Sequence, residues 1–199
     1  MRKLITIIAL FILSSCSSVP RQQNLNYEGN IALDRGNYSV AIQKFHRALN
    51  ESVSASDDQY HAIAMYGLGR AYGYLCQFKE SEKWLLKSIS ARESLPNTKH
   101  AYLSQNIMEL ARLYKANKEY SKANIQFERA ILILEELDIR ESDPIGYAGV
   151  LEDFMFTLRA AGNNKRAKEI SNIIAKLKSD NVNKPAYFVA KQYPDNCKE

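Results

Sequence analysis

Apolar and small residues from Met65 to Ile89 form two stripes with helical spacing, separated by a short break at Cys76-Gln77. Residues three, four and seven apart lie on one face of a helix, so each stripe predicts an amphipathic helix. Two helices joined by so short a turn must lie antiparallel, as a hairpin. We expect Gly69 and Ser81 to let the two backbones approach closely. The stripes consist of Met65, Leu68, Gly69, Tyr72 and Leu75, then Phe78, Ser81, Leu85, Ser88 and Ile89.

The same pattern recurs in three further segments of the chain. Gly29 and Gly69 are 40 residues apart, and the corresponding positions Leu68, Leu110 and Phe154 follow at intervals of 42 and 44. One hairpin leaves an apolar face uncovered, so we expect the hairpins to stack on one another. The further copies are marked by Gly29, Ala32, Tyr38, Ala41, Phe45 and Ala48; by Ile107, Leu110, Ala111, Tyr114, Tyr120, Ala123, Phe127 and Ala130; and by Leu151, Phe154, Leu158, Gly162, Ala167, Ile170 and Ile174.

The loops between these copies end in residues that suit the start of a helix. Asp57-Asp58, Asn97-Thr98 and Asp143 stand where N-caps are needed, and Pro144 fits the first helical position after Asp143. These caps fall at matching phases, so they support the repeat register independently of the apolar stripes. The sequence Gly162-Asn163-Asn164 predicts the turn of the last hairpin.

The repeated motif resembles the tetratricopeptide repeat (TPR), in the longer form found in kinesin light chains. The resemblance implies an all-α fold, a right-handed α-solenoid of about four TPR-like helix-turn-helix repeats over residues 25–178. It informs the fold far more than the function, because the motif residues are packing residues. The matching positions are Leu68, Gly69, Tyr72, Phe78, Ser81, Leu85 and Ser88, and Leu110, Ala111, Tyr114, Tyr120, Ala123, Phe127 and Ala130.

Residues 1–15 have the composition of a targeting signal. Arg2 and Lys3 precede an apolar run from Leu4 to Leu13, which is too short to span a bilayer as a permanent helix. The following Leu13-Ser14-Ser15-Cys16 resembles the lipobox of bacterial lipoproteins.

That resemblance implies cleavage before Cys16 and acylation of this residue, with palmitate among the usual acyl groups. Ser17 favours an outer-membrane lipoprotein that faces the periplasm. Residues 16–24 are then the lipidated cysteine and a short tether. The alternative is an ordinary secretory signal whose cleavage site holds a cysteine.

Composition and motifs argue against catalysis and nucleic-acid binding. Without Arg2 and Lys3, 25 Lys and Arg face 22 Asp and Glu, and a net charge of +3 is too small to indicate a nucleic-acid partner. No phosphate-binding loop or nucleophile motif occurs. We therefore expect no enzyme, no cofactor and no metal site. The three histidines (His46, His61 and His100) lack metal-ligand spacing, His46 is expected at the surface, and the acidic pairs Glu135-Glu136 and Glu152-Asp153 are expected on solvated helix faces.

The C-terminal region, residues 179–199, leaves two alternatives open. A short capping helix from Pro185 would cover the end of the solenoid, whereas the polar composition suits a disordered tail. Cys76 and Cys197 also admit two interpretations, namely a disulfide that ties the tail across the repeats or two unconnected thiols.

The remaining function is binding. In TPR proteins the first helix of each hairpin lines the concave face, and its non-motif positions contact partners. Asn30, Arg70 and Arg112 share one phase and should form a row that holds a segment carrying a carboxylate, unless the arginines are solvated or pair internally with Asp34 or Glu109. The predicted partner-binding residues are Asn30, Tyr66, Arg70, Tyr74, Arg112, Lys115 and Arg159.

These observations predict a membrane-anchored periplasmic scaffold that binds a protein or peptide partner. The expected role is assembly of an envelope complex such as a pilus or a secretion machine. Two alternatives remain, a structural lipoprotein that self-associates into a homo-oligomer and a regulator of a cell-wall enzyme.

Overall fold

The computed structural model describes residues 19–96, 100–189, 191–194 and 197. Within these ranges the chain forms nine helices and no strand. No helix there is long and apolar enough to cross a bilayer. The helices are α1 (Arg21–Asp34), α2 (Tyr38–Ser54), α3 (Asp58–Tyr74), α4 (Phe78–Ser94), α5 (His100–Ala116), α6 (Tyr120–Glu136), α7 (Ile139–Ser142), α8 (Pro144–Ala160) and α9 (Asn164–Asp180).

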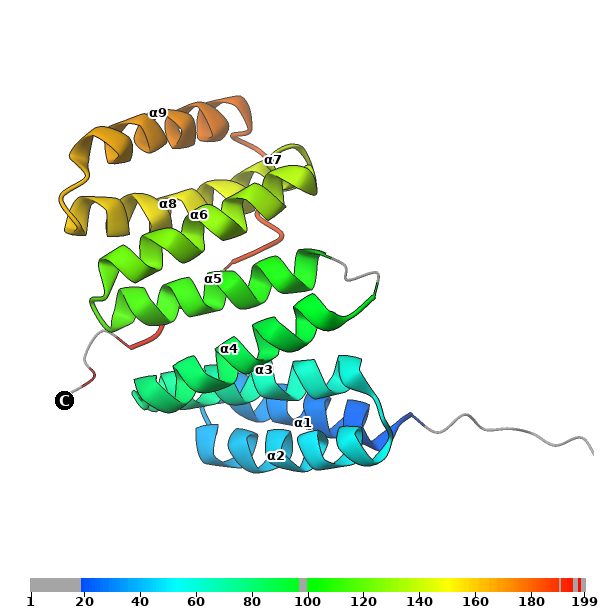
Figure 1. Ribbon diagram of the computed structural model, residues 1–199. Helices are drawn as coiled ribbons and strands as arrows, with labels where there is room; N and C mark the ends of the chain where they lie inside the picture. The colour runs from blue at the N-terminus through cyan, green and yellow to red at the C-terminus, as the bar shows by residue number, and fades with distance from the viewer. Residues whose placement is uncertain (1–18, 97–99, 190, 195–196, 198–199) are drawn as a thin grey trace, which may run out of the picture.

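Four antiparallel hairpins stack into a single elongated array. They are α1–α2, α3–α4, α5–α6 and α8–α9, with the short α7 before α8, and Figure 1 shows them in order from the blue end of the chain to the orange end. The apolar stripes meet between hairpins, where Phe45, Leu68, Leu110, Phe127 and Phe154 are all buried. All five belong to one continuous core, so each hairpin covers the apolar face of the next.

The predicted close approach within the second hairpin is confirmed. The hydroxyl of Ser81 donates a hydrogen bond of 2.7 Å to the carbonyl oxygen of Gly69. A Cβ atom on Gly69 would lie 2.6 Å from Leu85, closer than any real contact. Only glycine therefore lets α3 and α4 pack at this distance.

Several helix starts and turns also follow the sequence-based expectation. The side chains of Asp57, Asp143 and Asn163 accept hydrogen bonds from backbone N–H groups three residues on, with lengths of 3.1, 2.9 and 3.2 Å. Gly162 has φ of +82° in the last turn. The cap expected at Asn97-Thr98 lies outside the described residues, as does the signal segment with Cys16.

Cys76 stands in the turn of the second hairpin with φ of +60°. At the corresponding turn positions, which have the same left-handed conformation, the first and last hairpins carry Gly36 and Gly162. The Cys76 N–H donates to the carbonyl of Gly73 at 2.9 Å, and the next N–H donates to that of Tyr72 at 3.0 Å. The turn therefore ends α3 and places Cys76 at the end of the hairpin.

His46 is not the surface residue expected from the sequence. It is partly buried, with its ring 5.6 Å from that of Trp84 in an edge-on arrangement, and its Nε2 lies 3.5 Å from the hydroxyl of Tyr72. His46 is covered because the second hairpin stacks on the first, and the residue pattern of one helix cannot predict a contact with another hairpin.

The central position of Leu68 allows a direct test of the repeat register. Its side chain is fully buried, so Leu68→Ala should lower the free energy of unfolding by about 2–5 kcal/mol, measured by urea denaturation. The exposed Lys83 on α4 is the control, and Lys83→Ala should change stability by less than about 0.5 kcal/mol. Equal shifts for the two variants would contradict this register.

Candidate functional site

The inner face of the array is lined by the first helices of the hairpins, and the C-terminal tail lies along it. Contacts join α1 to α3, α3 to α5 and α5 to α8. After α9 the described residues 182–189, 191–194 and 197, which we call the tail, form no helix. Figure 1 shows this segment returning from the end of the array toward its middle. The tail thus covers residues that the sequence assigned to a partner.

At the α8 end, Asp143 holds the backbone of the tail. Its carboxylate accepts hydrogen bonds from the N–H groups of Tyr187 and Phe188, at 3.2 and 3.0 Å. The same carboxylate caps α8 through the N–H of Gly146 at 2.9 Å. One side chain therefore both starts a helix and docks the tail. The ring of Phe188 lies beneath the guanidinium of Arg112, at 5.4 Å from its centroid.

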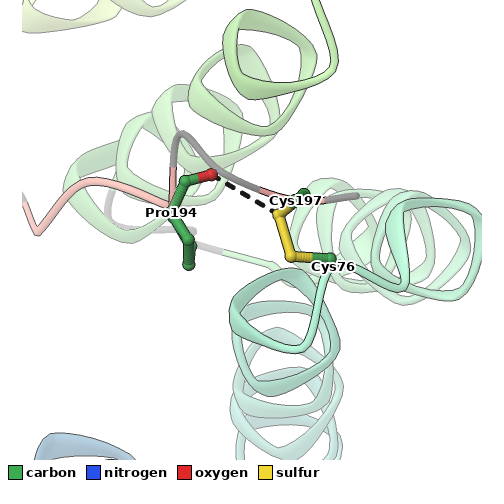
Figure 2. Close-up of a disulfide and its surroundings, with 3 residues drawn as sticks. All are labelled: Cys76, Pro194 and Cys197. Atoms are coloured by element: carbon green, nitrogen blue, oxygen red, sulfur yellow. Dashed lines mark hydrogen bonds between the residues drawn. A yellow bond between two sulfur atoms is a disulfide. The ribbon is translucent and has the colours of Figure 1, made fainter. Parts of the chain in front are cut away.

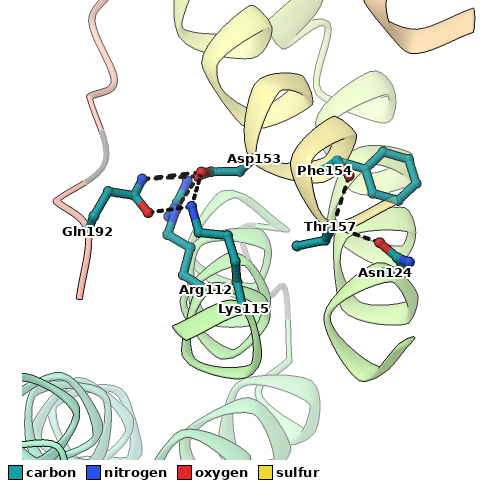
Figure 3. A network of polar contacts seen from close by, with 7 residues as sticks. All are labelled: Arg112, Lys115, Asn124, Asp153, Phe154, Thr157 and Gln192. Carbon is teal, nitrogen blue, oxygen red and sulfur yellow. Dashed lines mark hydrogen bonds and ion pairs between the residues drawn. The ribbon is translucent and has the colours of Figure 1, made fainter. Parts of the chain in front are cut away.

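Next along the tail, a polar network surrounds Asp153 (Figure 3). Arg112 Nε donates to Asp153 Oδ2 at 2.9 Å, and Lys115 Nζ donates to Oδ1 at 2.6 Å. Gln192 of the tail donates to both carboxylate oxygens, at 3.3 and 3.2 Å, and accepts from Lys115 Nζ at 2.7 Å. The network joins α5, α8 and the tail.

The expectation of a solvated Asp153 is therefore wrong. Its side chain is 10% exposed and that of Arg112 only 2%, because α5 packs on α8 at this point. Burial by itself raises the pKa of Asp153, but the positive charges of Arg112 and Lys115 outweigh it and hold the pKa below the usual value. Glu152 does face solvent, where it pairs with Lys178.

The far part of the tail inserts an aromatic side chain between α3 and α5. Tyr193 is 4% exposed, and its ring centroid lies 4.9 Å from that of Tyr74. Gly73 makes this possible, because a Cβ atom there would lie 2.3 Å from the Tyr193 ring. The Tyr74 hydroxyl donates to the carbonyl oxygen of Lys191 at 3.4 Å, and its other ring face stacks on Tyr38.

Beneath Tyr193 lies a buried cluster of aromatic and charged groups. Burial and the neighbouring charge of Glu109 raise the pKa values of Tyr66 and Tyr193 well above normal, and that of Tyr74 to about 12. The Arg70 guanidinium lies 5.6 Å from the centroid of the Tyr66 ring. Burial works against the charge of Arg70, yet Tyr66 and Glu109 raise its pKa overall. The tyrosines are therefore neutral and the arginine is charged throughout the physiological range.

The tail is closed by a disulfide between Cys76 and Cys197, residues 121 apart in sequence (Figure 2). Their Cα atoms are 5.5 Å apart, and both residues are partly exposed. The sulfur of Cys197 also contacts the carbonyl oxygen of Pro194 at 3.4 Å. The interpretation of the two cysteines as a bridge is thus the one that the structure shows.

Five of the seven predicted binding residues meet around the tail, namely Tyr66, Arg70, Tyr74, Arg112 and Lys115. Asn30 lies on α1 and Arg159 on α8, and neither makes a hydrogen bond or ion pair with a described residue of the tail. The sequence predicted Asp143 only as a helix cap and did not predict its contact with the tail. It also did not predict that the tail lies on the inner face. The isolated aromatic residues of an otherwise polar tail were the available signal. The described residues contain no group of three or more acidic, histidine or cysteine side chains able to hold a metal.

Comparison with known proteins shows the fold. The chain is similar to the crystal structure of BtubC (BKLC) from P. vanneervenii, with a TM-score of 0.74 and 16% identity over 89% of this chain and 71% of the other. It is also similar to a putative kinesin light chain from Podospora anserina with nearly identical TPR-like repeats, at a TM-score of 0.65 and 16% identity over 82% and 78%. No family model and no curated protein matches the sequence. The chain is therefore an all-α, TPR-like solenoid.

The Asp153 network predicts a stability that depends on pH. Asp153→Asn leaves Arg112 without its counter-charge, so we expect a loss of about 3 kcal/mol in the free energy of unfolding at pH 7. The pKa of Asp153 is lower in the folded protein than its value of about 3.8 in the unfolded chain. The ion pair therefore stabilises the fold fully when the pH is above the unfolded pKa, and this stabilisation is lost as the pH falls through the folded pKa. Urea denaturation should show the gap to wild type closing below pH 4.

The exposed neighbour Glu152 provides the matched control for this experiment. Glu152→Gln should change stability by less than about 0.5 kcal/mol at every pH, because its pair with Lys178 is open to solvent. A gap between wild type and Asp153→Asn that stayed constant from pH 7 to pH 3 would contradict the assigned charge pairing.

Proposed function

We propose that this protein is a lipid-anchored scaffold in the periplasm that binds a segment of a partner protein along the inner face of its solenoid. A TPR-like fold indicates a protein–protein interaction scaffold. The single observation that carries the proposal is the tail. The inner face already holds an extended peptide segment, through side chains that the sequence assigned to partner binding.

The chemistry of this face suits a peptide. Tyr66 and Tyr74 offer rigid apolar area with polar tips, and Arg70 and Arg112 offer planar donors, the residue types that recur as interface hot spots. Asp143 supplies a carboxylate for backbone N–H groups. We infer a binding role rather than a catalytic one, since Asp153, Arg112 and Lys115 bond to one another and to Gln192 of the tail.

The membrane anchor rests on the lipobox-like sequence that ends at Cys16. Helix α1 begins at Arg21, so only a few residues separate the first repeat from the proposed lipid. Three acyl chains would insert firmly into a bilayer, at about 0.8 kcal/mol for each buried CH₂. The scaffold would thus be held close to the outer membrane, a position suited to assembling an envelope complex such as a pilus or secretion machine.

The anchor is tested by Cys16→Ala. The variant should fail to incorporate radiolabelled palmitate in growing bacteria and should accumulate as the uncleaved precursor, whereas wild type is labelled and recovered with outer membranes. Cys197→Ser, which changes a cysteine far from the signal, is the control and should keep the label. Palmitate incorporation that persists in Cys16→Ala would overturn the lipoprotein assignment.

Partner binding on the inner face is tested by photo-crosslinking in the envelope. Phe156 of α8 is 53% exposed, beside Lys115, whose Nζ lies 5.6 Å from its ring centroid. A photoreactive phenylalanine at this position should form an adduct with one partner, identified by mass spectrometry. The control position is Ile125, which is 62% exposed on α6, the second helix of the α5–α6 hairpin. An adduct from Ile125 alone would move the binding surface to the outer face.

A further inference from the structure

We propose that the tail is a tethered occupant of the inner groove, locked in place by the Cys76–Cys197 disulfide. Reduction of this disulfide would admit a partner segment of the same chemistry. That segment is extended, with two aromatic side chains five residues apart and a glutamine before the second, as in Phe188, Gln192 and Tyr193. This proposal rests on the proposed function, and it adds the chemistry of the partner segment and the disulfide that regulates its access.

The tail is bound as a separate peptide would be. Its backbone is recognised through the N–H groups of Tyr187 and Phe188 and through the carbonyl of Lys191. Its side chains alternate, because Phe188 packs inward while Tyr187 and Val189 are each 80% exposed. Alternation of this kind is typical of an extended ligand whose outer edge stays open.

Two aromatic anchors define the sequence that the groove selects. Phe188 lies against the guanidinium of Arg112, and Tyr193 fills the hollow left by Gly73. Between them Gln192 offers a donor to Asp153 and an acceptor to Lys115 at the same time. A carboxylate at this position has no hydrogen to donate to Asp153 and a lysine has no acceptor for Lys115, so an amide side chain fits both partners.

The tail fills the groove incompletely, which leaves room for a better occupant. Two buried donor atoms of the groove, Arg70 Nε and Arg112 Nη2, find no hydrogen-bonding partner among the described residues. A pocket of about 230 Å³ also remains between α8 and the tail, bordered by Gly149 and Phe188. A segment that filled this space and paired these atoms would bind more tightly than the tail.

The disulfide decides whether such a segment can compete. A tethered tail faces its groove at an effective concentration in the millimolar range, and the bond from Cys197 to Cys76 fixes its far end as well. A dithiol reductant would attack one sulfur of the disulfide, which releases the other cysteine and forms a mixed disulfide with the protein. The second thiol of the reductant would then attack this mixed disulfide and release the remaining cysteine. Cys76 and Cys197 leave as two thiols, and the dithiol becomes a disulfide. Both cysteines are partly exposed, so the reductant has access.

The test uses the full chain and a fluorescein-labelled peptide of residues 185–197 in which serine replaces the cysteine. Fluorescence anisotropy compares oxidised wild type, Cys197→Ser, and a triple variant Phe188→Ala, Tyr193→Ala, Cys197→Ser whose own tail is weakened. The triple variant should bind most tightly, Cys197→Ser at least about tenfold more weakly, and oxidised wild type not detectably. A peptide with alanine at both aromatic positions should bind to none of them.

A substitution at Gly73 confirms the location of the peptide. Gly73→Ala in the triple variant should abolish peptide binding, because the new Cβ occupies the Tyr193 site. Ser90→Ala, at an exposed position on α4, is the control and should leave peptide binding unchanged. Helical circular dichroism and the melting temperature show that each variant is folded.

Three results would overturn the proposal. A folded triple variant that ignores the peptide would show that the groove does not recognise this pattern. Equal affinity for oxidised wild type and Cys197→Ser would remove the disulfide from control of access. Dimers of Cys197→Ser that the peptide dissociates would make a second copy the occupant rather than a separate partner. Photo-crosslinking from Phe156 is independent of the peptide, so the scaffold function could survive each of these results.

Discussion

Burial of the apolar stripe on each hairpin is the constraint on which the rest of the structure depends. A hairpin such as α3–α4 carries apolar side chains toward both neighbours, and it cannot cover them alone. Stacking covers them and, as a consequence, brings α3, α5 and α8 side by side along the inner face. The position of the inner face is therefore a product of core packing.

Those polar residues are themselves organised by burial. Stacking removes Asp153 and Arg112 from water, and a buried charge is tolerated only when it is paired. Lys115 and Gln192 complete the pairing, which couples the packing of α5 on α8 to the position of the tail. A binding surface and a structural ion pair thus share the same side chains, and occupation of the groove stabilises the solenoid.

The tail extends this relation to the whole array. It leaves α9 at one end, contacts α8 through Asp143, then α5 and α3, and reaches the turn after α3 at Cys76. A solenoid whose repeats contact only their neighbours gains a long-range connection in this way. The turn itself contributes, since the left-handed conformation at Cys76 presents the sulfur toward the tail. In our proposal, the tail is an example of the ligand chemistry that the groove accepts.

The sequence alone determined the paired helices of the four hairpins, the caps at Asp57 and Asp143 and the turn at Gly162-Asn163-Asn164, because these follow from contacts a few residues apart. It also singled out Tyr66, Arg70, Tyr74, Arg112 and Lys115, since repeat phase fixes which helix face is turned inward. Only the tertiary structure decided that Asp153 is buried, that the tail lies in the groove and that Cys76 pairs with Cys197. Each of these depends on the distance between helices that are far apart in sequence, and local periodicity carries no information about that distance.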